Sequence, residues 1–350
     1  MTFKYVFWAF GPAINAFHLC PPIISIDGAH LKGSYMGKLL IAVTKDANNN
    51  ILPIAYVIVD EETSHSWCWF LYNFRLFVAR DRQLCVISDR HKGIAHAMTN
   101  LDEWKETLAY HCFCLRHVRS NFIKRYENLS LKRFCWAIGS TTQERKFLGY
   151  KRQIKEINIE AWHYLEQIDK SKWCLLFDEN HRWGCLTTNI SESINNALRG
   201  ARQLPIKACI NLTFNRTVQL FRKHSEIAMN CNTPLPSRMW RVFNNHDTRA
   251  QSHQFSEFKY TEGVYRIITK LRTNGTGGNT HTVHYFQQAC TCGKWQMERF
   301  PCSHALAVCR HRGDNPFTII NSVYTTTTYR QQYQSNFIPL PHPDYWLLAT

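Results

Sequence analysis

Acidic residues close two short apolar runs of this chain. Asp27 directly follows Ile23–Ile26, and Asp89 directly follows Leu84–Ser88. Both runs are typical of buried strands. Two carboxylates within a few ångströms of each other repel, and a divalent cation between them is the usual remedy. With Glu192 as a third ligand, these acids predict a two-metal site that activates a water or a 3′-hydroxyl at a phosphodiester.

Each acid also has a purely structural explanation. Gly28 lets the backbone turn directly after Asp27, so this acid could simply close a turn. Asp89 could cap the following helix, and Glu192 could be a solvated acid on a helix face. Taken singly, these explanations are favoured. Taken as a set, in the element order described below, the three acids favour the metal site.

A second group of metal-ligand residues lies near the C-terminus. Cys290, Cys292, Cys302 and His304 have the spacing C-x-C-x₉-C-x-H. Three thiolates and one imidazole make a closed tetrahedral site for a structural Zn²⁺, with the last pair at a helix that begins near Ser303. The alternative is that these are four unrelated core residues.

Cysteine and histidine also cluster between the second and third acids, at a predicted strand-to-helix junction. Cys114 and His117 are expected to lie near the acids and to orient the active site or the DNA. A discrete zinc site that also uses His111 and Cys112 is the alternative, and packing is favoured over it.

The elements that must position these residues follow from apolar periodicity. The polar segment 45–50 predicts a hairpin turn. Ser64 is the predicted cap of a helix with one apolar face. That face comprises Trp67, Phe70, Leu71, Phe74 and Phe77. The predicted elements in chain order are strands 23–27, 38–44 and 51–59, a helix from 64, strand 84–89, helix 94–101, strand 108–114 and helix 115–126.

Three strands, a helix and then strand–helix units predict an α/β fold with an antiparallel first half and a parallel continuation. This is the element order of the ribonuclease-H-like fold. In such a sheet the first and fourth strands are neighbours, so Asp27 and Asp89 can converge. Residues 127–186 predict an all-α insertion. Residues 187–199 predict a further helix, whose polar face includes Asn189, Glu192 and Asn196.

The sequence therefore divides into a mixed α/β core and a small zinc-binding module. The predicted parts are a helical lead-in (1–22), the core (23–200), a helical connector (201–255), the zinc-finger region (256–315) and an extended C-terminal tail (316–350).

Composition limits the class of protein. The 350 residues are 45% hydrophobic and 19% charged, which is typical of a globular chain. The net charge of +16 suits a polyanionic partner, nucleic acid first, and the alternative is a basic protein without such a partner.

Fourteen cysteines at irregular spacing favour a reducing compartment, nuclear or cytosolic. The uncharged segment 5–26 could pass for a signal or membrane segment, but Pro12 and the pair Pro21–Pro22 interrupt it.

Four motifs in this order resemble the transposases of plant Mutator-like elements (MULEs). The matching runs are Ile24–Gly33, Asn50–Ala55, Ser88–Gly93 and Thr187–Glu192. The resemblance implies a DDE triad at Asp27, Asp89 and Glu192 that uses Mg²⁺ or Mn²⁺. It also implies a Cys-x₂-His motif at Cys114 and His117. A DNA partner, a nuclear location and a homo-oligomer without membrane contact are expected on the same grounds.

The C-x-C-x₉-C-x-H segment resembles a SWIM-type zinc finger, a module that binds DNA or protein and often follows this kind of transposase core. The leading hypothesis is a Mutator-like transposase that binds DNA and transfers phosphodiester strands. The alternative is a domesticated, transposase-derived transcription regulator that binds DNA without cutting it. A third hypothesis is a zinc-dependent protein-interaction factor.

Overall fold

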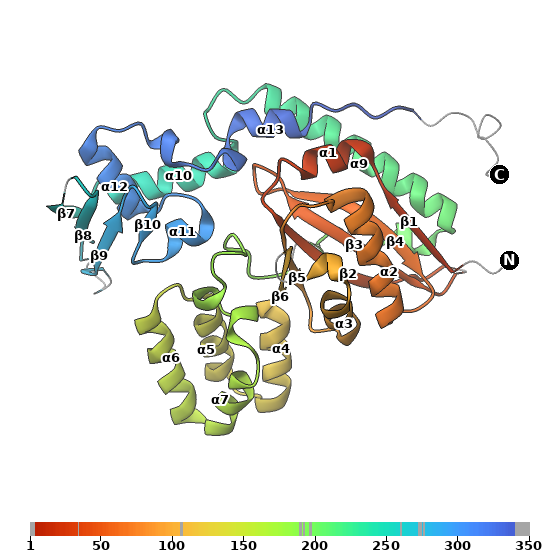
Figure 1. Cartoon of the computed structure of the whole chain (residues 1–350), viewed down its shortest axis with the longest axis horizontal. Helices are drawn as coiled ribbons and strands as arrows, with labels where there is room; N and C mark the ends of the chain where they lie inside the picture. The colour runs from red at the N-terminus through yellow and green to blue at the C-terminus, as the bar shows by residue number, and fades with distance from the viewer. Residues whose placement is uncertain are drawn as a thin grey trace.

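The computed structural model describes residues 4–339 except 34, 106–107, 189–190, 192, 196–197, 260, 272–274 and 276. Its strands are β1 (Tyr5–Ala9), β2 (Ile23–His30), β3 (Lys38–Lys45), β4 (Ile51–Val59), β5 (Leu84–Ser88), β6 (Ala109–Phe113), β7 (Gln254–Lys259), β8 (Val264–Ile268), β9 (Thr280–His284) and β10 (Ala289–Cys290). Its α-helices are α1 (Gly11–Phe17), α2 (Ser64–Phe74), α3 (Lys92–Asn100), α4 (Leu115–Tyr126), α5 (Leu129–Ser140), α6 (Glu144–Ile157), α7 (Ile159–Glu166), α9 (Ile206–Met229), α10 (Ser237–Ala250), α11 (Lys294–Glu298), α12 (Ser303–Arg312) and α13 (Thr326–Gln332). They form a mixed α/β core, a helical bundle and a second, smaller sheet (Figure 1).

The core contains a six-stranded mixed sheet in the order β1-β4-β3-β2-β5-β6. Along this order β1, β4, β3 and β2 pair antiparallel, whereas β2, β5 and β6 pair parallel. The predicted antiparallel first half and parallel continuation are therefore confirmed. The strand that carries Asp27 is also the direct neighbour of the strand that precedes Asp89, as expected.

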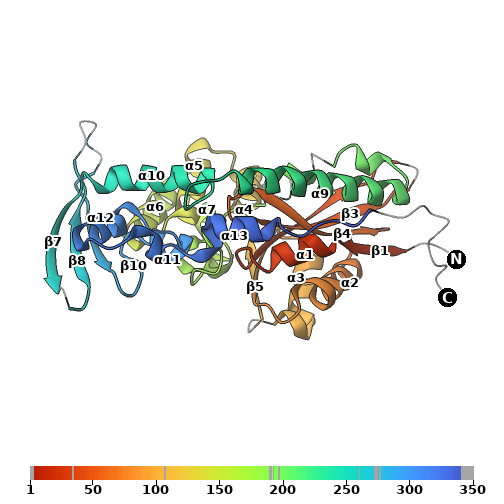
Figure 2. The same ribbon diagram turned by 90° about the horizontal axis from the view of Figure 1, so that it is seen from above.

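Helices cover both faces of this sheet. On β3, Leu40 and Ala42 pack into a core shared with α1, α2 and α3, whereas Leu39 and Ile41 pack toward the first half of α9. Figure 2 shows α9 on one side of the sheet and α1 to α3 on the other. Burial on both faces explains why β3 is a continuous apolar run. The predicted connector 201–255 is helical, but its first helix, α9, is a layer of the core.

The prediction of a helical lead-in over residues 1–22 is wrong, because the segment contains a strand. Tyr5–Ala9 pairs with β4 as an edge strand, and only Gly11–Phe17 within the described lead-in is α-helical. Trp8 packs on the α9 side of the sheet and Phe7 on the α2 side. This alternation of two apolar faces is a strand pattern, which the many aromatic side chains obscured.

β2 also differs from the predicted strand 23–27, because it continues through Gly28 to His30. Gly28 makes no turn there. A Cβ atom at this position would lie 3.1 Å from the carboxyl oxygens of Glu62, so the glycine leaves room for that side chain. Asp27 therefore projects from within a strand that remains paired with β3 beyond it.

Helix α2 begins at Ser64, one residue earlier than a cap at Ser64 would require. Its cap is Thr63, whose hydroxyl accepts a hydrogen bond from the Ser66 N–H at 3.2 Å. The predicted apolar face is buried except for Phe77, which is 54% exposed. The α-helix ends at Phe74 and continues as a π-helical turn, which rotates later side chains away from the core.

The predicted all-α insertion is present as a bundle. Helices α5, α6 and α7 pack together with α4, and their shared core includes Phe122, Phe134 and Trp162 (Figure 1). The bundle therefore has its own hydrophobic core and extends from the end of β6.

The C-terminal part contains a four-stranded antiparallel sheet in the order β10-β9-β8-β7. Helices α10 and α12 pack on it around a core that includes Tyr265, Trp295 and Leu306. No described helix is long and apolar enough to span a membrane.

The prediction of an extended tail after residue 315 is wrong for the described part of this segment, which is largely helical. Two 3₁₀ turns (Pro316–Ile319 and Ser322–Tyr324) lead into α13. The buried Tyr333 hydroxyl donates to Asp46 Oδ2 at 2.8 Å, which attaches this segment to the β3–β4 hairpin. Aromatic side chains among the many Thr and Tyr residues therefore bury themselves against the core. Residues 340–350 of the predicted tail lie outside the described residues.

Candidate metal-binding sites

Asp27 lies in β2, and Asp89 directly follows the neighbouring strand β5. β2 pairs with β5 in a parallel register that sets Ser25 opposite Ile87. Two residues further along both segments, the same register brings Asp27 level with Asp89. β5 ends at Ser88, whereas β2 continues past Asp27 to His30.

The Asp27 carboxyl is half-buried and electrostatically crowded. Its Oδ2 accepts a hydrogen bond from the Asn195 amide at 2.8 Å, and its Oδ1 accepts one from the Gly28 N–H at 3.0 Å. Burial, and then the charge of Asp89, raise the pKa of Asp27 to about 6, although both hydrogen bonds and His117 oppose the rise. A divalent cation between the two carboxylates would relieve this repulsion, so the residues present fit Mg²⁺ or Mn²⁺.

Asp89 is attached to the start of α3 but does not cap it. Its Oδ1 accepts a hydrogen bond from the His91 N–H at 2.9 Å. The N-cap is His91 itself, whose ring nitrogen accepts from the Gly93 N–H at 3.1 Å. The structural explanation of Asp89 as the helix cap is therefore wrong, and the hydrogen bond orients the carboxyl directly after β5.

Glu192 lies outside the residues that the structure describes, so its place in the site stays a prediction. The residues on either side of it contact β2. The Ser191 hydroxyl lies 3.0 Å from the Ser25 hydroxyl, and Asn195 donates to Asp27. Both contacts hold this segment over the strand that carries the first acid.

Asn195 is a site residue that the sequence analysis missed. It is buried, and its amide orients the Asp27 carboxyl. The signal was its spacing, because residues three positions apart share one face of a helix, and Asn195 follows Glu192 by three. The polar face proposed from the sequence used Asn189 and Asn196, which both lie outside the described residues.

Cys114 joins the acidic edge to the segment before Glu192. Its N–H donates to the Ser88 carbonyl at 2.7 Å, and its sulfur accepts from the Thr188 N–H at 3.3 Å. Burial acts to raise the pKa of the Cys114 thiol, but hydrogen bonds with His117 and Thr188 lower it to about 7. Cys114 is thus a buried link between β6 and this segment.

His117 lies in the first turn of α4, beside the acids. The hydrogen bond with Cys114 raises the pKa of His117 against the effect of burial, and the charges of Asp89 and Asp27 raise it further. The structure thus brings Cys114 and His117 together next to both acids. Their role in orienting the site stays a prediction.

The four predicted zinc ligands converge in the second sheet. The ligand atoms of Cys290, Cys292, Cys302 and His304 are buried and lie within 4.8 Å of one another. His304 Nδ1 is 3.6 Å from the sulfur of Cys290 and 3.7 Å from that of Cys302. A tetrahedral zinc with ordinary Zn–S and Zn–N bonds separates its sulfur and nitrogen ligands by roughly 3.6 Å. The residues present therefore fit a structural Zn²⁺.

The fold explains this convergence. β10 ends at Cys290, Gly293 turns the chain with a φ of 79°, and α12 begins directly after Cys302. Hydrogen bonds with Cys290 and Cys302 lower the pKa of the Cys292 thiol, which makes a thiolate available to a metal.

The zinc module also contacts the rest of the molecule. The Thr142 hydroxyl, between α5 and α6, donates to the Cys292 carbonyl at 2.6 Å. Trp183 packs against the core of the zinc module and against the cluster of buried residues around β5 and β6. Its ring centroid is 6.3 Å from that of Tyr324. A chain of contacts thus links the zinc module to the acidic edge.

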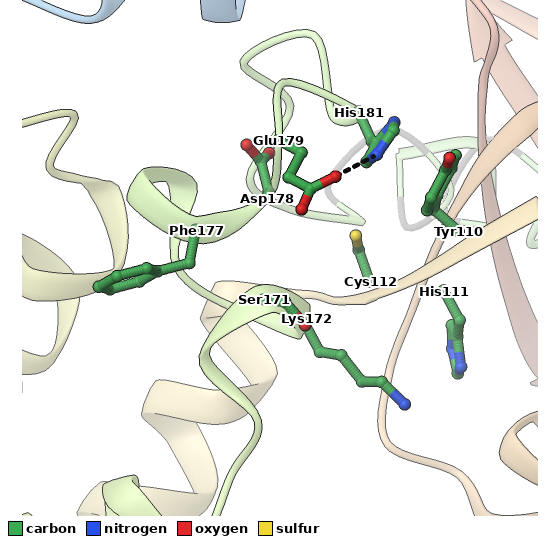
Figure 3. Close-up of a pocket in the computed structure, with 9 residues that line it drawn as sticks. All are labelled: Tyr110, His111, Cys112, Ser171, Lys172, Phe177, Asp178, Glu179 and His181. Atoms are coloured by element: carbon green, nitrogen blue, oxygen red, sulfur yellow. Dashed lines mark ion pairs between the residues drawn. The ribbon is translucent and has the colours of Figure 1, made fainter. Parts of the chain in front are cut away.

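A cavity of about 230 Å³ lies beside β6 (Figure 3). The His181 ring stacks on Tyr110 with 3.3 Å between ring centroids, and the Cys112 thiol lies between this pair and Phe177. A hydrogen bond with Cys85 lowers the pKa of the Cys112 thiol to about 7 against the effect of burial.

The alternative of a discrete zinc site around Cys114 finds no support in the geometry. Within the described residues, Cys290, Cys292, Cys302 and His304 are the one group of three or more such residues with ligand atoms close enough for a metal. His111 instead hydrogen-bonds the Ser88 hydroxyl at 2.8 Å.

Comparison with known families agrees with this division of the chain. The model of the MULE transposase domain matches residues 23–121, and that of the SWIM zinc finger matches residues 281–313. The first match includes Asp27 and Asp89, and the second includes all four zinc ligands. These two matches support a transposase-like, DNA-related function and zinc binding.

The search of curated proteins finds no significant match. Among solved structures, one chain of a cryo-electron-microscopy structure of the simian T-cell lymphotropic virus intasome, in complex with the PP2A regulatory subunit B56 gamma, is 16% identical with a TM-score of 0.20. The match covers 35% of this chain and 49% of that chain.

Proposed function

We propose that this protein is a Mutator-like transposase, which binds DNA and cleaves and transfers phosphodiester strands in DNA transposition. The observation that carries the proposal is the closeness of Asp27 in β2 to Asp89, directly after the neighbouring parallel strand β5, where the charge of Asp89 raises the pKa of Asp27. The MULE transposase match spans both acids.

The catalytic residues in this proposal are Asp27, Asp89 and Glu192, which would hold two Mg²⁺ or Mn²⁺ ions. The bound cations would lower the pKa of the attacking water or hydroxyl and neutralise charge on the leaving oxygen. Asn195 holds the Asp27 carboxylate in one orientation through its 2.8 Å hydrogen bond. His117 adds a proton-carrying group beside both acids.

The remaining parts of the proposal concern the fold, location and assembly. The order of the sheet, in which β2, β3 and β4 pair antiparallel and β5 and β6 continue parallel on the other side of β2, supports a ribonuclease-H-like core. A nuclear location and a homo-oligomer follow from the family resemblance and complete the proposal. Light scattering with and without DNA would measure the oligomeric state.

A domesticated regulator is the second candidate, in which the same core binds DNA without cutting it. The high net charge of +16 and the SWIM match support this function equally well. The third hypothesis, a zinc-dependent protein-interaction factor, would need neither DNA nor the acids. Cleavage therefore separates the first candidate from the others.

The test is a nicking assay on supercoiled DNA with purified protein and Mg²⁺ or Mn²⁺. We expect metal-dependent nicks, and a loss of at least ~100-fold in rate in Asp27→Ala and in Asp89→Ala, because each removes a ligand. The control is Asp102→Ala, which changes an exposed acid in the same core. Equal nicking by all four proteins would contradict the enzymatic proposal.

A further inference from the structure

A groove of about 540 Å³ runs along α4, beside the acidic edge. Its polar lining residues include Arg116, His117, Arg119 and Ser120 on α4 and Lys132 on α5. On α4 these residues recur every three or four positions, so they form one stripe that faces the second helix. The groove is therefore a feature of two rigid helices and not of a loop.

Three cations of the groove, Arg119, Lys124 and Lys132, carry the argument for its ligand. Lys124 and Lys132 are exposed, and Arg119 lies with its guanidinium 4.9 Å from the ring centroid of Trp136. Within the described part of the chain, no acidic side chain pairs with these three cations. Glu127 is the one acid in the lining. Such a surface attracts a polyanion, because each contact releases counterions.

The groove also leads to the acids. α4 begins directly after Cys114, whose N–H donates to the carbonyl of Ser88, the residue before Asp89. His117 lines the inner end of the groove and lies within electrostatic range of both acids. From His117 to Glu127 the helix rises by about 15 Å, the distance that about four phosphates of one strand occupy along a duplex axis.

The lining favours a double-stranded ligand. Proteins that hold single strands offer exposed aromatic rings on which bases stack. This groove is lined by basic side chains, a serine, an isoleucine and one glutamate, and the nearby Trp136 ring already lies against Arg119. Cations without stacking rings contact the backbone and not the bases.

We propose that the α4 groove binds the phosphate backbone of duplex DNA and guides one strand toward Asp27 and Asp89, with Arg119, Lys124 and Lys132 as phosphate-contacting residues. This proposal rests on the proposed function for the identity of the ligand, but it does not require that the protein cut DNA.

The test measures the affinity for an uncleaved 30-base-pair duplex as a function of salt, with no divalent metal added. The variant Arg119→Gln/Lys124→Gln/Lys132→Gln should reduce the slope of log K against log[salt] by about 3, and weaken binding ~100-fold near physiological salt. The matched control removes three exposed cations from α6, as Arg145→Gln/Arg152→Gln/Lys155→Gln, which lie outside the groove lining. Unchanged thermal midpoints and zinc content verify the fold of both variants.

A reduced slope in the groove variant alone supports the proposal, as does weaker competition by single-stranded DNA and by polyglutamate. The proposal would be overturned if the two triple variants had equal effects, or if the groove variant had no effect. It would also be overturned if polyglutamate competed as well as duplex DNA. The nicking assay fails or succeeds separately. DNA binding through the groove without nicking would leave this proposal standing and favour the regulator, whereas nicking with an unchanged slope would reject the groove alone.

Discussion

At the residue scale, the site depends on a carboxyl group that is costly to keep charged. Asp27 is half-buried, and Asp89 repels it. Hydrogen bonds from Asn195 and Gly28 reduce this cost but do not remove it, since the pKa of Asp27 remains raised at about 6. Such an arrangement is typical of a functional site, where a ligand or ion supplies the missing stabilisation.

We therefore predict that Asp27→Asn stabilises the protein at pH 7.5 by ~1–3 kcal/mol when no divalent cation is added. Because the pKa of Asp27 is raised, the folded state binds this proton more tightly than the unfolded state does. The free energy of unfolding of the wild type should therefore increase as the pH falls from above 6 toward 4. The stabilisation by Asp27→Asn should fade over the same range. Denaturant unfolding at several pH values measures both effects.

The control for this prediction is Asp102→Asn, at an exposed surface pair with Lys105, which should leave the free energy of unfolding nearly unchanged. A destabilising effect of Asp27→Asn at pH 7.5 would show that the charged carboxylate is already fully compensated by the protein.

At the element scale, two short connections position the functional groups. The junction of β6 and α4 places Cys114 and His117 beside the acids. The turn between β10 and α11 and the start of α12 bring the four zinc ligands together. Because β10 has two residues and α11 five, neither element is stable alone, and the metal is expected to hold them.

We predict about one equivalent of zinc per chain, and its loss in Cys292→Ser/Cys302→Ser, since two of four ligands are removed. Metal analysis of the dialysed protein measures this directly. Cys309→Ser is the matched control, because Cys309 is a buried cysteine of α12 whose sulfur donates to the Asp314 carbonyl. A wild-type protein without zinc, or equal loss in the control, would contradict the zinc site.

At the scale of the whole molecule, features that depend on local sequence patterns could be predicted, whereas features that depend on contacts between distant parts of the chain could not. The order of the sheet and the zinc ligands followed from short apolar runs and from close spacing of Cys and His. Tyr5–Ala9 forms a strand where a helix is predicted. The strand depends on pairing with β4, whose residues lie about fifty positions away in the chain. The same holds for the tail, where Tyr333 reaches back to Asp46. Asn195 was missed because its spacing from Glu192 does not by itself show that its amide reaches Asp27, a residue far away in the chain.

The whole molecule also joins its two sites through the stretch around Trp183, which contacts both the zinc core and the residues below the acidic edge. The zinc module is therefore expected to support the position of the segment that leads to Thr188 and Asn195. The proposed function depends above all on one divalent-metal site formed by Asp27 and Asp89.

The most direct test is a Mn²⁺ titration followed by electron paramagnetic resonance, in wild-type protein and in Asp27→Asn and Asp89→Asn. We predict a Mn²⁺ site that Mg²⁺ displaces and whose affinity falls at least ~10-fold in each variant, with zinc content unchanged. Mn²⁺ binding of equal affinity in the wild type and both variants would contradict it, as would a wild-type protein that binds no Mn²⁺.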